Sequence, residues 1–149
     1  CAGLYKLGVS KIDMYTRNIV NSKETLDTLR NRFSNIEFRA IQNSLMQSLE
    51  DVDILINTTP LGMKNFSEDK CPVEDKNLET LSDKAIVYDI VYNPLKTALI
   101  SKAIKYNKKY ITGIDMLIYQ AIRACEIWFD KKPDFKTIKV ALMEKFLLG

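Results

Sequence analysis

The chain has 149 residues, of which 46% are hydrophobic and 28% charged, and its 22 basic and 19 acidic side chains give a formal net charge of +3. This composition is typical of one soluble globular domain and excludes disordered and collagen-like chains. No apolar run approaches the roughly 20 residues of a membrane-spanning helix. The only dense group of cations is Lys105, Lys108 and Lys109. We therefore expect neither a membrane nor a nucleic acid as a partner.

The histidine and cysteine content limits the kinds of catalytic and metal site that the chain can form. The chain has no histidine, which excludes histidine-based catalysis and imidazole zinc sites within it. Its cysteines, Cys1, Cys71 and Cys125, are far apart and odd in number, so the sequence predicts neither a disulfide framework nor a cysteine metal motif. This usage favours a reducing, cytoplasmic environment. Because the chain starts at Cys1 without a methionine or a signal-like segment, we interpret it as a piece of a longer protein.

Strand-like and helix-like segments alternate in the first part of the chain. The patterns predict a helix end over Cys1–Leu7, a strand over Lys11–Thr16, a helix over Ser22–Phe33 capped by Ser22, a short strand over Glu37–Ile41, a short helix over Ser44–Leu49, and a strand over Val52–Asn57 that is buried on both faces.

The alternation continues in the second part. The patterns predict a long loop over Lys64–Asp83 with a short helix near Leu78–Leu81, a buried strand over Lys84–Val91, a helix over Thr97–Tyr106, a strand over Tyr110–Thr112, a helix capped by Asp115, and a last helix over Phe135–Leu148 capped by Asp134. The helix after Asp115 carries one apolar stripe, formed by Ile114, Leu117, Ile118, Ala121, Ile122, Cys125 and Phe129.

Strands separated by helices predict a doubly wound α/β fold with a mostly parallel sheet, because parallel neighbours need crossover connections. In such sheets, ligands bind at the carboxyl ends of the strands. The segments to search are therefore the ones that follow strands: Thr16–Asn21, Asn57–Met63, Asp89–Pro94 and Gly113–Gln120.

The first of these segments points to a dinucleotide. An acidic residue at this position in a nucleotide-binding unit binds the ribose of NAD, whereas an arginine suits the 2′-phosphate of NADP. Here the acid is missing, and Thr16, Arg17 and Asn18 can all donate to phosphate oxygens. An isolated arginine is more often a solvated loop cation, but its place at a strand end favours NADP.

The other segments are less specific. Taken alone, Asn57–Met63 is an ordinary turn with room for close approach of a ligand. Asp89 suits a structural role, bonding the backbone of its own loop, while Tyr92 offers a hydroxyl to a ligand. Met116 and Gln120 share one flank of a helix, where Gln120 either reaches a hydroxylated substrate or is merely half exposed; the two interpretations are even.

Three motifs carry a resemblance to a known family: INTTPLGM (Ile56–Met63), YDIVYNPLKT (Tyr88–Thr97) and GIDMLIYQAIRACEIW (Gly113–Trp128). In this order and spacing they resemble the C-terminal, NADP-binding half of the shikimate dehydrogenases, which reduce 3-dehydroshikimate to shikimate in aromatic amino-acid biosynthesis. The resemblance implies that residues 1–149 are a Rossmann-like domain, the C-terminal part of a larger two-domain enzyme.

The resemblance also implies roles for individual residues. Around the adenosine 2′-phosphate it places Thr16, Arg17, Asn18 and Asn21. This triplet alters the first and third residues of the family's Asn-Arg-Thr, and Asn21 stands where the family has a second basic residue. Beside the pyrophosphate and ribose the resemblance places Thr58, Thr59 and Pro60, at the nicotinamide Ile90 and the Gly113 backbone, and facing shikimate Tyr92 and Gln120.

Parts of the family's pattern are not found in this sequence. The family's catalytic lysine and aspartate lie in an N-terminal domain that would precede Cys1, as would the first strand and the glycine-rich loop. No residue of this chain is therefore assigned a catalytic role, and Lys64 and Lys96 are interpreted as solvated. Without the central first strand, Lys11–Thr16 would lack a neighbour and two sheet edges would be exposed.

Two explanations of such open edges are considered. Either the chain is a portion of a longer polypeptide, or neighbouring copies supply the pairing by domain swapping in a homodimer. For function, the leading hypothesis is an NADP-dependent shikimate dehydrogenase. The alternatives are a quinate/shikimate dehydrogenase that uses NAD, and a nucleotide-binding module without catalysis.

Overall fold

The structure is a computed structural model that describes residues 1–46 and 48–147. It divides into two compact units, Cys1–Gln47 and Ser48–Gly149. Every strand pair in the described ranges is parallel, which confirms the predicted α/β class. None of the described helices is long and apolar enough to cross a membrane.

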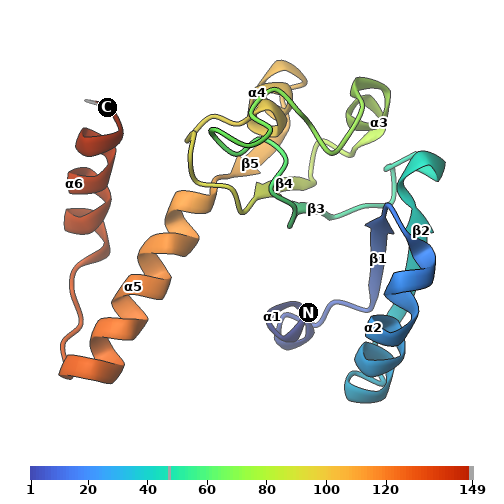
Figure 1. Cartoon of the computed structure of the whole chain (residues 1–149), viewed down its shortest axis with the longest axis horizontal. Coiled ribbons are helices and arrows are strands. Elements are labelled where there is room, and N and C mark those ends of the chain that lie inside the picture. The colour runs from blue at the N-terminus through green and yellow to red at the C-terminus, as the bar shows by residue number, and fades with distance from the viewer. Residues whose placement is uncertain (47, 148–149) are drawn as a thin grey trace. The chain divides into compact units, whose positions relative to one another are not determined.

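The first unit is a strand–helix–strand crossover (Figure 1). Its elements are α1 (Ala2–Lys6), β1 (Lys11–Thr16), α2 (Ile19–Arg32), β2 (Glu37–Gln42) and the 3₁₀ turn η1 (Asn43–Leu45). β1 pairs with β2 from Lys11 opposite Glu37 to Thr16 opposite Gln42. The core consists of Leu26, Phe33, Ile36 and Phe38, against which Ile12 and Met14 of β1 pack. The predicted strand Lys11–Thr16 is confirmed residue for residue.

Two local predictions in this unit are wrong. Asn18 caps α2, accepting bonds from the amides of Val20 at 3.0 Å and Asn21 at 3.3 Å; the expected cap, Ser22, lies inside the helix and donates to the Ile19 carbonyl at 2.7 Å. The expected helix Ser44–Leu49 is reduced to the three-residue turn η1. Residue 47 of that predicted helix lies outside the described residues.

The second unit contains a three-stranded sheet followed by a helical hairpin (Figure 1). Its elements are β3 (Ile54–Asn57), α3 (Asp75–Thr80), β4 (Ile86–Asp89), α4 (Ala98–Lys105), β5 (Lys109–Ile111), α5 (Gly113–Phe129) and α6 (Phe135–Leu147). The strand order is β3-β4-β5. The register sets Asn57 opposite Asp89, so the polar ends of β3 and β4 meet at one edge of the sheet.

The sheets end on unpaired edges. Among the described strands, β1 pairs only with β2, and β3 pairs only with β4. Strand Lys11–Thr16 thus has a neighbour on one edge, β2, while its other edge is unpaired among the described strands, in line with the expectation of an open edge there. The predicted burial of both faces of Val52–Asn57 is wrong, since Ile54 of this strand is 38% exposed.

The hairpin of α5 and α6 buries most of the predicted apolar stripe. Ile114, Ile118 and Ile122 pack against Phe135, Ile138 and Leu142 of α6, whereas Ala121 and Phe129, at the margin of the stripe, are exposed. Asp134 caps α6, accepting from the Thr137 amide at 2.8 Å, as predicted. Asp115 does not cap α5, because the helix already begins at Gly113; Asp115 instead pairs with Lys139 of α6 at 2.7 Å.

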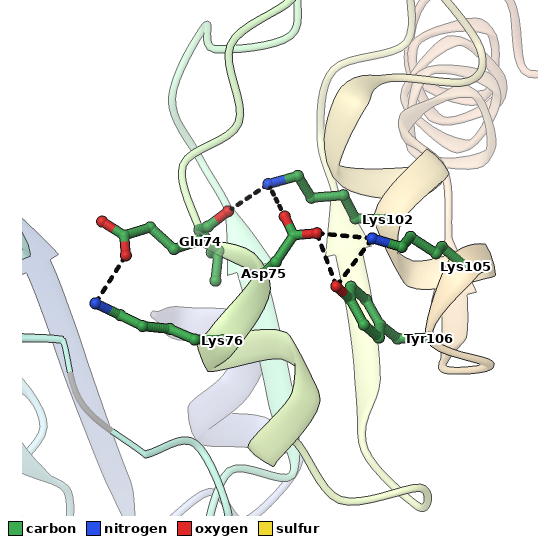
Figure 2. A network of polar contacts seen from close by, with 7 residues as sticks. Glu74, Asp75, Lys76, Lys102, Lys105 and Tyr106 are labelled. Atoms are coloured by element: carbon green, nitrogen blue, oxygen red, sulfur yellow. Dashed lines mark hydrogen bonds and ion pairs between the residues drawn. The ribbon is translucent and has the colours of Figure 1, made fainter.

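A charged network joins α3 to α4 (Figure 2). The Asp75 carboxylate accepts from the Nζ atoms of Lys102 and Lys105 and from the Tyr106 hydroxyl, the last at 2.7 Å. Hydrogen bonds from Lys102, Tyr106 and Lys105 hold the pKa of Asp75 well below its ordinary value. Two of the three lysines of the basic cluster seen in the sequence thus form ion pairs, because Lys105 binds Asp75 and Lys108 binds Asp83 as well as the Leu81 carbonyl.

Gly113 allows α5 to start directly against the end of β4. A Cβ atom built on Gly113 would lie 2.3 Å from the Ile90 carbonyl oxygen and 2.7 Å from the Val91 carbonyl oxygen. Both atoms belong to the backbone and cannot swing aside. Only glycine fits where the helix and the strand end approach this closely.

We expect Gly113→Ala to destabilise the second unit by about 2–4 kcal/mol, because overpacking against backbone forces strand and helix apart. Gly3→Ala is the control, since no atom lies within 4 Å of its added Cβ. Because alanine is more favourable than glycine in a helix by up to about 1 kcal/mol, this variant should not be destabilised. Urea unfolding of the polypeptide expressed from the intact gene measures both. Equal midpoints for the two variants would contradict the close approach.

We expect Asp75→Asn to lower the free energy of unfolding at pH 7 and to have less effect at pH 3. A carboxylate with a lowered pKa contributes stability above its unfolded pKa, near the ordinary value of 3.8, and that contribution is lost as the pH falls toward its folded pKa. Urea unfolding of native and variant protein at both pH values measures this. Asp69→Asn, in an exposed loop of the same unit, is the control; a native-to-variant difference at Asp75 that is as large at pH 3 as at pH 7 would refute the network's role.

Candidate functional site

The turn after β1 gathers the four residues predicted at the adenosine phosphate. An open pocket of about 350 Å³ is lined by Thr16, Arg17, Asn18, Asn21, Ser22 and Thr25. The Thr16 hydroxyl and the Asn18 backbone bond each other at 3.3 Å, which fixes the turn between β1 and α2. The predicted grouping of Thr16, Arg17, Asn18 and Asn21 around one pocket is therefore present in the structure.

The electrostatics of this pocket favour an anion. The pocket lies at the amino end of the 14-residue helix α2, where the helix dipole is positive. The described residues of the first turn of α2 include no acid, and the Arg17 side chain is exposed beside them. A guanidinium and side-chain amide donors such as those of Asn18 and Asn21 are groups that bind phosphate oxygens, so these residues fit a phosphate such as the 2′-phosphate of NADP.

The ends of β3 and β4 are tied together by a buried polar network. Asp89 is 0% exposed. Its Oδ1 accepts from Asn57 Nδ2 at 2.9 Å and from the Val91 amide at 3.1 Å, and its Oδ2 accepts from the Thr97 hydroxyl at 2.6 Å. Burial raises the pKa of Asp89, and these three hydrogen bonds oppose that shift. The expectation that Asp89 bonds its own loop is confirmed.

Asn57 extends this network into the turn that follows β3. Its Oδ1 accepts from the Thr59 amide at 3.0 Å and from the Thr59 hydroxyl at 2.7 Å, and its Nδ2 donates to the Leu61 carbonyl at 3.1 Å. Gly62 closes the turn at φ +92°, a conformation that favours glycine. Thr58, Thr59 and Pro60 are thereby held exposed at the carboxyl end of the sheet.

The remaining predicted residues lie in the same second unit. Ile90 follows β4 directly, and its carbonyl oxygen faces Gly113 at the start of α5. Tyr92 is 43% exposed in the next turn, which is also tied to the first one because the Lys64 amide donates to the Asn93 carbonyl at 2.9 Å. Gln120 is exposed on α5, two turns after Gly113.

The predicted residues thus fall into two groups. Those expected at the adenosine phosphate belong to the first unit, and those expected at the pyrophosphate, nicotinamide and substrate belong to the second. Lys64 and Lys96 are exposed, in keeping with their interpretation as solvated cations. Within residues 1–46 and 48–147, no cluster of three or more histidine, cysteine or carboxylate side chains could hold a metal ion.

Sequence reasoning missed Asn57 and Thr97, which complete the Asp89 network. Both carried a signal. Asn57 is the one polar residue of β3, a position where an unpartnered amide is costly. Thr97 directly precedes α4 and caps it, accepting from the Ile100 amide at 3.2 Å.

Comparison with known proteins agrees with this arrangement. Residues 113–143 match the family described as the shikimate 5′-dehydrogenase C-terminal domain. The shikimate dehydrogenase (NADP(+)) of Methanosphaera stadtmanae is 34% identical over 143 residues, which cover 95% of this chain and 49% of the relative. The chain thus spans about half the length of the curated relatives it matches.

Solved structures show the same correspondence. A shikimate dehydrogenase crystallised with NADP+ superimposes with a TM-score of 0.77 at 30% identity, over 91% of this chain and 47% of that one. The enzyme of Listeria monocytogenes, in complex with shikimate and NAD, gives a TM-score of 0.82 at 26% identity, over 95% of this chain and 50% of that one. By sequence and by Rossmann-like fold, this chain is a relative of the C-terminal half of the shikimate dehydrogenases.

Proposed function

We propose that this chain is the cofactor-binding portion of an NADP-dependent shikimate dehydrogenase, which interconverts 3-dehydroshikimate and shikimate. The observation that carries this proposal is the pocket at the amino end of α2, where Arg17 stands among amide and hydroxyl donors. That pocket supplies what a 2′-phosphate requires. The relatives named shikimate dehydrogenase (NADP(+)) support it.

The proposal gives each group of residues a task. Thr16, Arg17, Asn18 and Asn21 bind the 2′-phosphate. The turn Thr58–Pro60 lies beside the pyrophosphate and ribose. Ile90 contacts the nicotinamide, and the Gly113 backbone, which lies against the Ile90 carbonyl, borders it. Tyr92 and Gln120 donate hydrogen bonds to the hydroxyl groups of shikimate.

The chemistry itself is divided between this chain and the rest of the enzyme. When NADP is bound, its nicotinamide would accept the hydride from the carbon that bears the reacting hydroxyl of shikimate. The residues of this chain hold the two reactants in place. The proton of that hydroxyl passes to a lysine and aspartate pair that this chain does not contribute. In the reduction, the hydride and the proton return to the same carbonyl.

We further propose that residues 1–149 belong to one nucleotide-binding domain of a larger two-domain enzyme in the cytoplasm. The relatives' greater length supports the first part. The three free thiols, Cys1, Cys71 and Cys125, support a reducing compartment. Formation of a homodimer stays a prediction.

One second candidate has a specific observation in its favour. The Listeria monocytogenes structure holds NAD together with shikimate, so a quinate/shikimate dehydrogenase that uses NAD is the alternative. The cofactor preference of the intact protein separates the two. A nucleotide-binding module without catalysis is the outcome if neither cofactor supports turnover.

We expect the polypeptide expressed from the intact gene to form NADPH in the presence of shikimate, and to form NADH more slowly. The 149-residue chain assayed alone should show no turnover, because the proton-transfer pair lies outside it. Absorbance at the nicotinamide band measures both rates. Faster turnover with NAD would favour the quinate/shikimate alternative, and inactivity with both cofactors would favour the binding module.

We expect Arg17→Ala to raise the KM for NADP by roughly 10- to 150-fold, because a hydrogen bond to a charged group contributes about 1.5–3 kcal/mol. The KM for NAD should stay within about twofold, since NAD has no 2′-phosphate. Arg32→Ala, at the other end of the same helix, is the matched control because it removes the same charge. Equal changes with both cofactors would contradict a phosphate contact.

A further inference from the structure

A single carboxylate holds three separate segments of the second unit. The Asp89 side chain is 0% exposed, and it accepts hydrogen bonds from the end of β3 through Asn57, from its own turn through the Val91 amide, and from the start of α4 through Thr97. All three donors point at two oxygen atoms. A buried group with this many partners fixes the relative positions of the segments that supply them.

Two of the three partners of Asp89, Asn57 and the Val91 amide, also determine the conformation of an exposed turn. Asn57 binds Thr59 through both its backbone amide and its hydroxyl, so the turn Thr58–Pro60 depends on how Asn57 is oriented. The hydrogen bond from the Val91 amide to Asp89 fixes the backbone between Ile90 and Tyr92. In the proposed function the first of these turns contacts the cofactor and the second contacts both the cofactor and the substrate. The positions of both turns therefore depend on the two oxygen atoms of Asp89.

We propose that Asp89 is a positioning residue that holds the cofactor-facing turn Thr58–Pro60 in register with the turn Ile90–Tyr92, in which the proposed function places Ile90 at the nicotinamide and Tyr92 at shikimate. This inference rests on the proposed function and deepens it. Asp89 itself is buried and touches neither ligand. It acts through Asn57, Val91 and Thr97, so its loss should weaken the binding of cofactor and substrate together.

The chemistry of the side chain makes the proposal testable with small changes. A carboxylate offers acceptors on both oxygens, whereas an asparagine at position 89 turns one of them into a donor. That donor would face Thr97 on one side, or Asn57 and the Val91 amide on the other. At position 97, valine keeps the shape of threonine but lacks the hydroxyl, and serine keeps the hydroxyl.

A matched control lies at the other end of α4. Asp75 also accepts from three donors, but they come from Lys102, Lys105 and Tyr106 near the carboxyl end of that helix (Figure 2). Thr97, the partner of Asp89, stands at its amino end. Asp75→Asn therefore breaks a carboxylate network of the same unit without reaching either of the two turns.

The experiment measures kcat and both KM values of the intact polypeptide carrying Asp89→Asn, Thr97→Val, Thr97→Ser or Asp75→Asn. A merely destabilised enzyme loses active molecules, which lowers the apparent kcat but leaves the KM values unchanged. For Asp89→Asn and Thr97→Val we expect the KM for NADP and for shikimate each to rise on the order of tenfold, and kcat/KM to fall on the order of 100-fold. Thr97→Ser and Asp75→Asn should keep both KM values within about twofold of native.

The outcomes separate this inference from the proposed function. If Asp89→Asn does not fold, as judged by circular dichroism, the Thr97→Val and Thr97→Ser pair decides the matter by the same criterion. An active native protein whose folded Asp89→Asn or Thr97→Val variant keeps native KM values overturns the positioning role alone. A native protein without shikimate-dependent activity overturns the proposed function, and the positioning role with it.

Discussion

Burial of the Asp89 carboxylate requires three segments of the second unit to come together. A carboxylate removed from water has to recover its hydrogen bonds from protein donors, or its ionised form becomes costly. Here the donors come from Asn57, from the Val91 amide and from Thr97, which lie on three different segments. The chain has to bring the end of β3, the turn after β4 and the start of α4 together before that requirement is met. The shape of the exposed turns is a consequence.

In the pocket of the first unit, by contrast, the charged group is exposed to solvent and not buried among protein donors. Its charged group, Arg17, is exposed, and the turn around it is ordered by short-range bonds of Thr16 and Asn18. An exposed cation next to a helix amino end needs no partner in the absence of ligand, because water solvates it. Such a site can take up and release an anion at low cost. In the proposed function the two units therefore contribute differently: the first offers charge to a solvent-exposed phosphate, and the second offers a fixed backbone surface.

Sequence reasoning located the strand ends better than the extents of the elements. Strand Lys11–Thr16 was predicted correctly because Ile12 and Met14 alternate with polar residues and face one core. The start of α2 was missed because its first turn carries Ile19 and Val20, which are 43% and 78% exposed and lie outside the apolar stripe that defines the rest of the helix. Asn18 is a residue type that favours the N-cap position, but the helix start was inferred from the apolar periodicity, which begins later in the sequence.

The candidate site was more predictable than its supporting contacts. The pocket residues Thr16 to Asn21 and the turns after β3 and β4 follow from one rule, that ligands meet parallel sheets at the carboxyl ends of strands. The bond between Asn57 and Asp89 joins residues that are 32 positions apart, so no local pattern could reveal it. Only the parallel register of β3 and β4 sets them opposite each other.

The same limit applies to Gly113. Its sequence context suggested a helix start with backbone available to a ligand, whereas the structure shows that this backbone lies against the Ile90 carbonyl with no room for a Cβ atom. The glycine therefore serves packing first. In the proposed function the nicotinamide borders the main chain here, from the turn after β4 and the start of α5, and the Val91 amide of that turn bonds Asp89. The backbone of Ile90 and Val91 thus contacts Gly113 on one side and Asp89 on the other. A substitution at Gly113 is therefore expected to disturb the Asp89 hydrogen bonds, and a substitution at Asp89 to disturb the packing around Gly113.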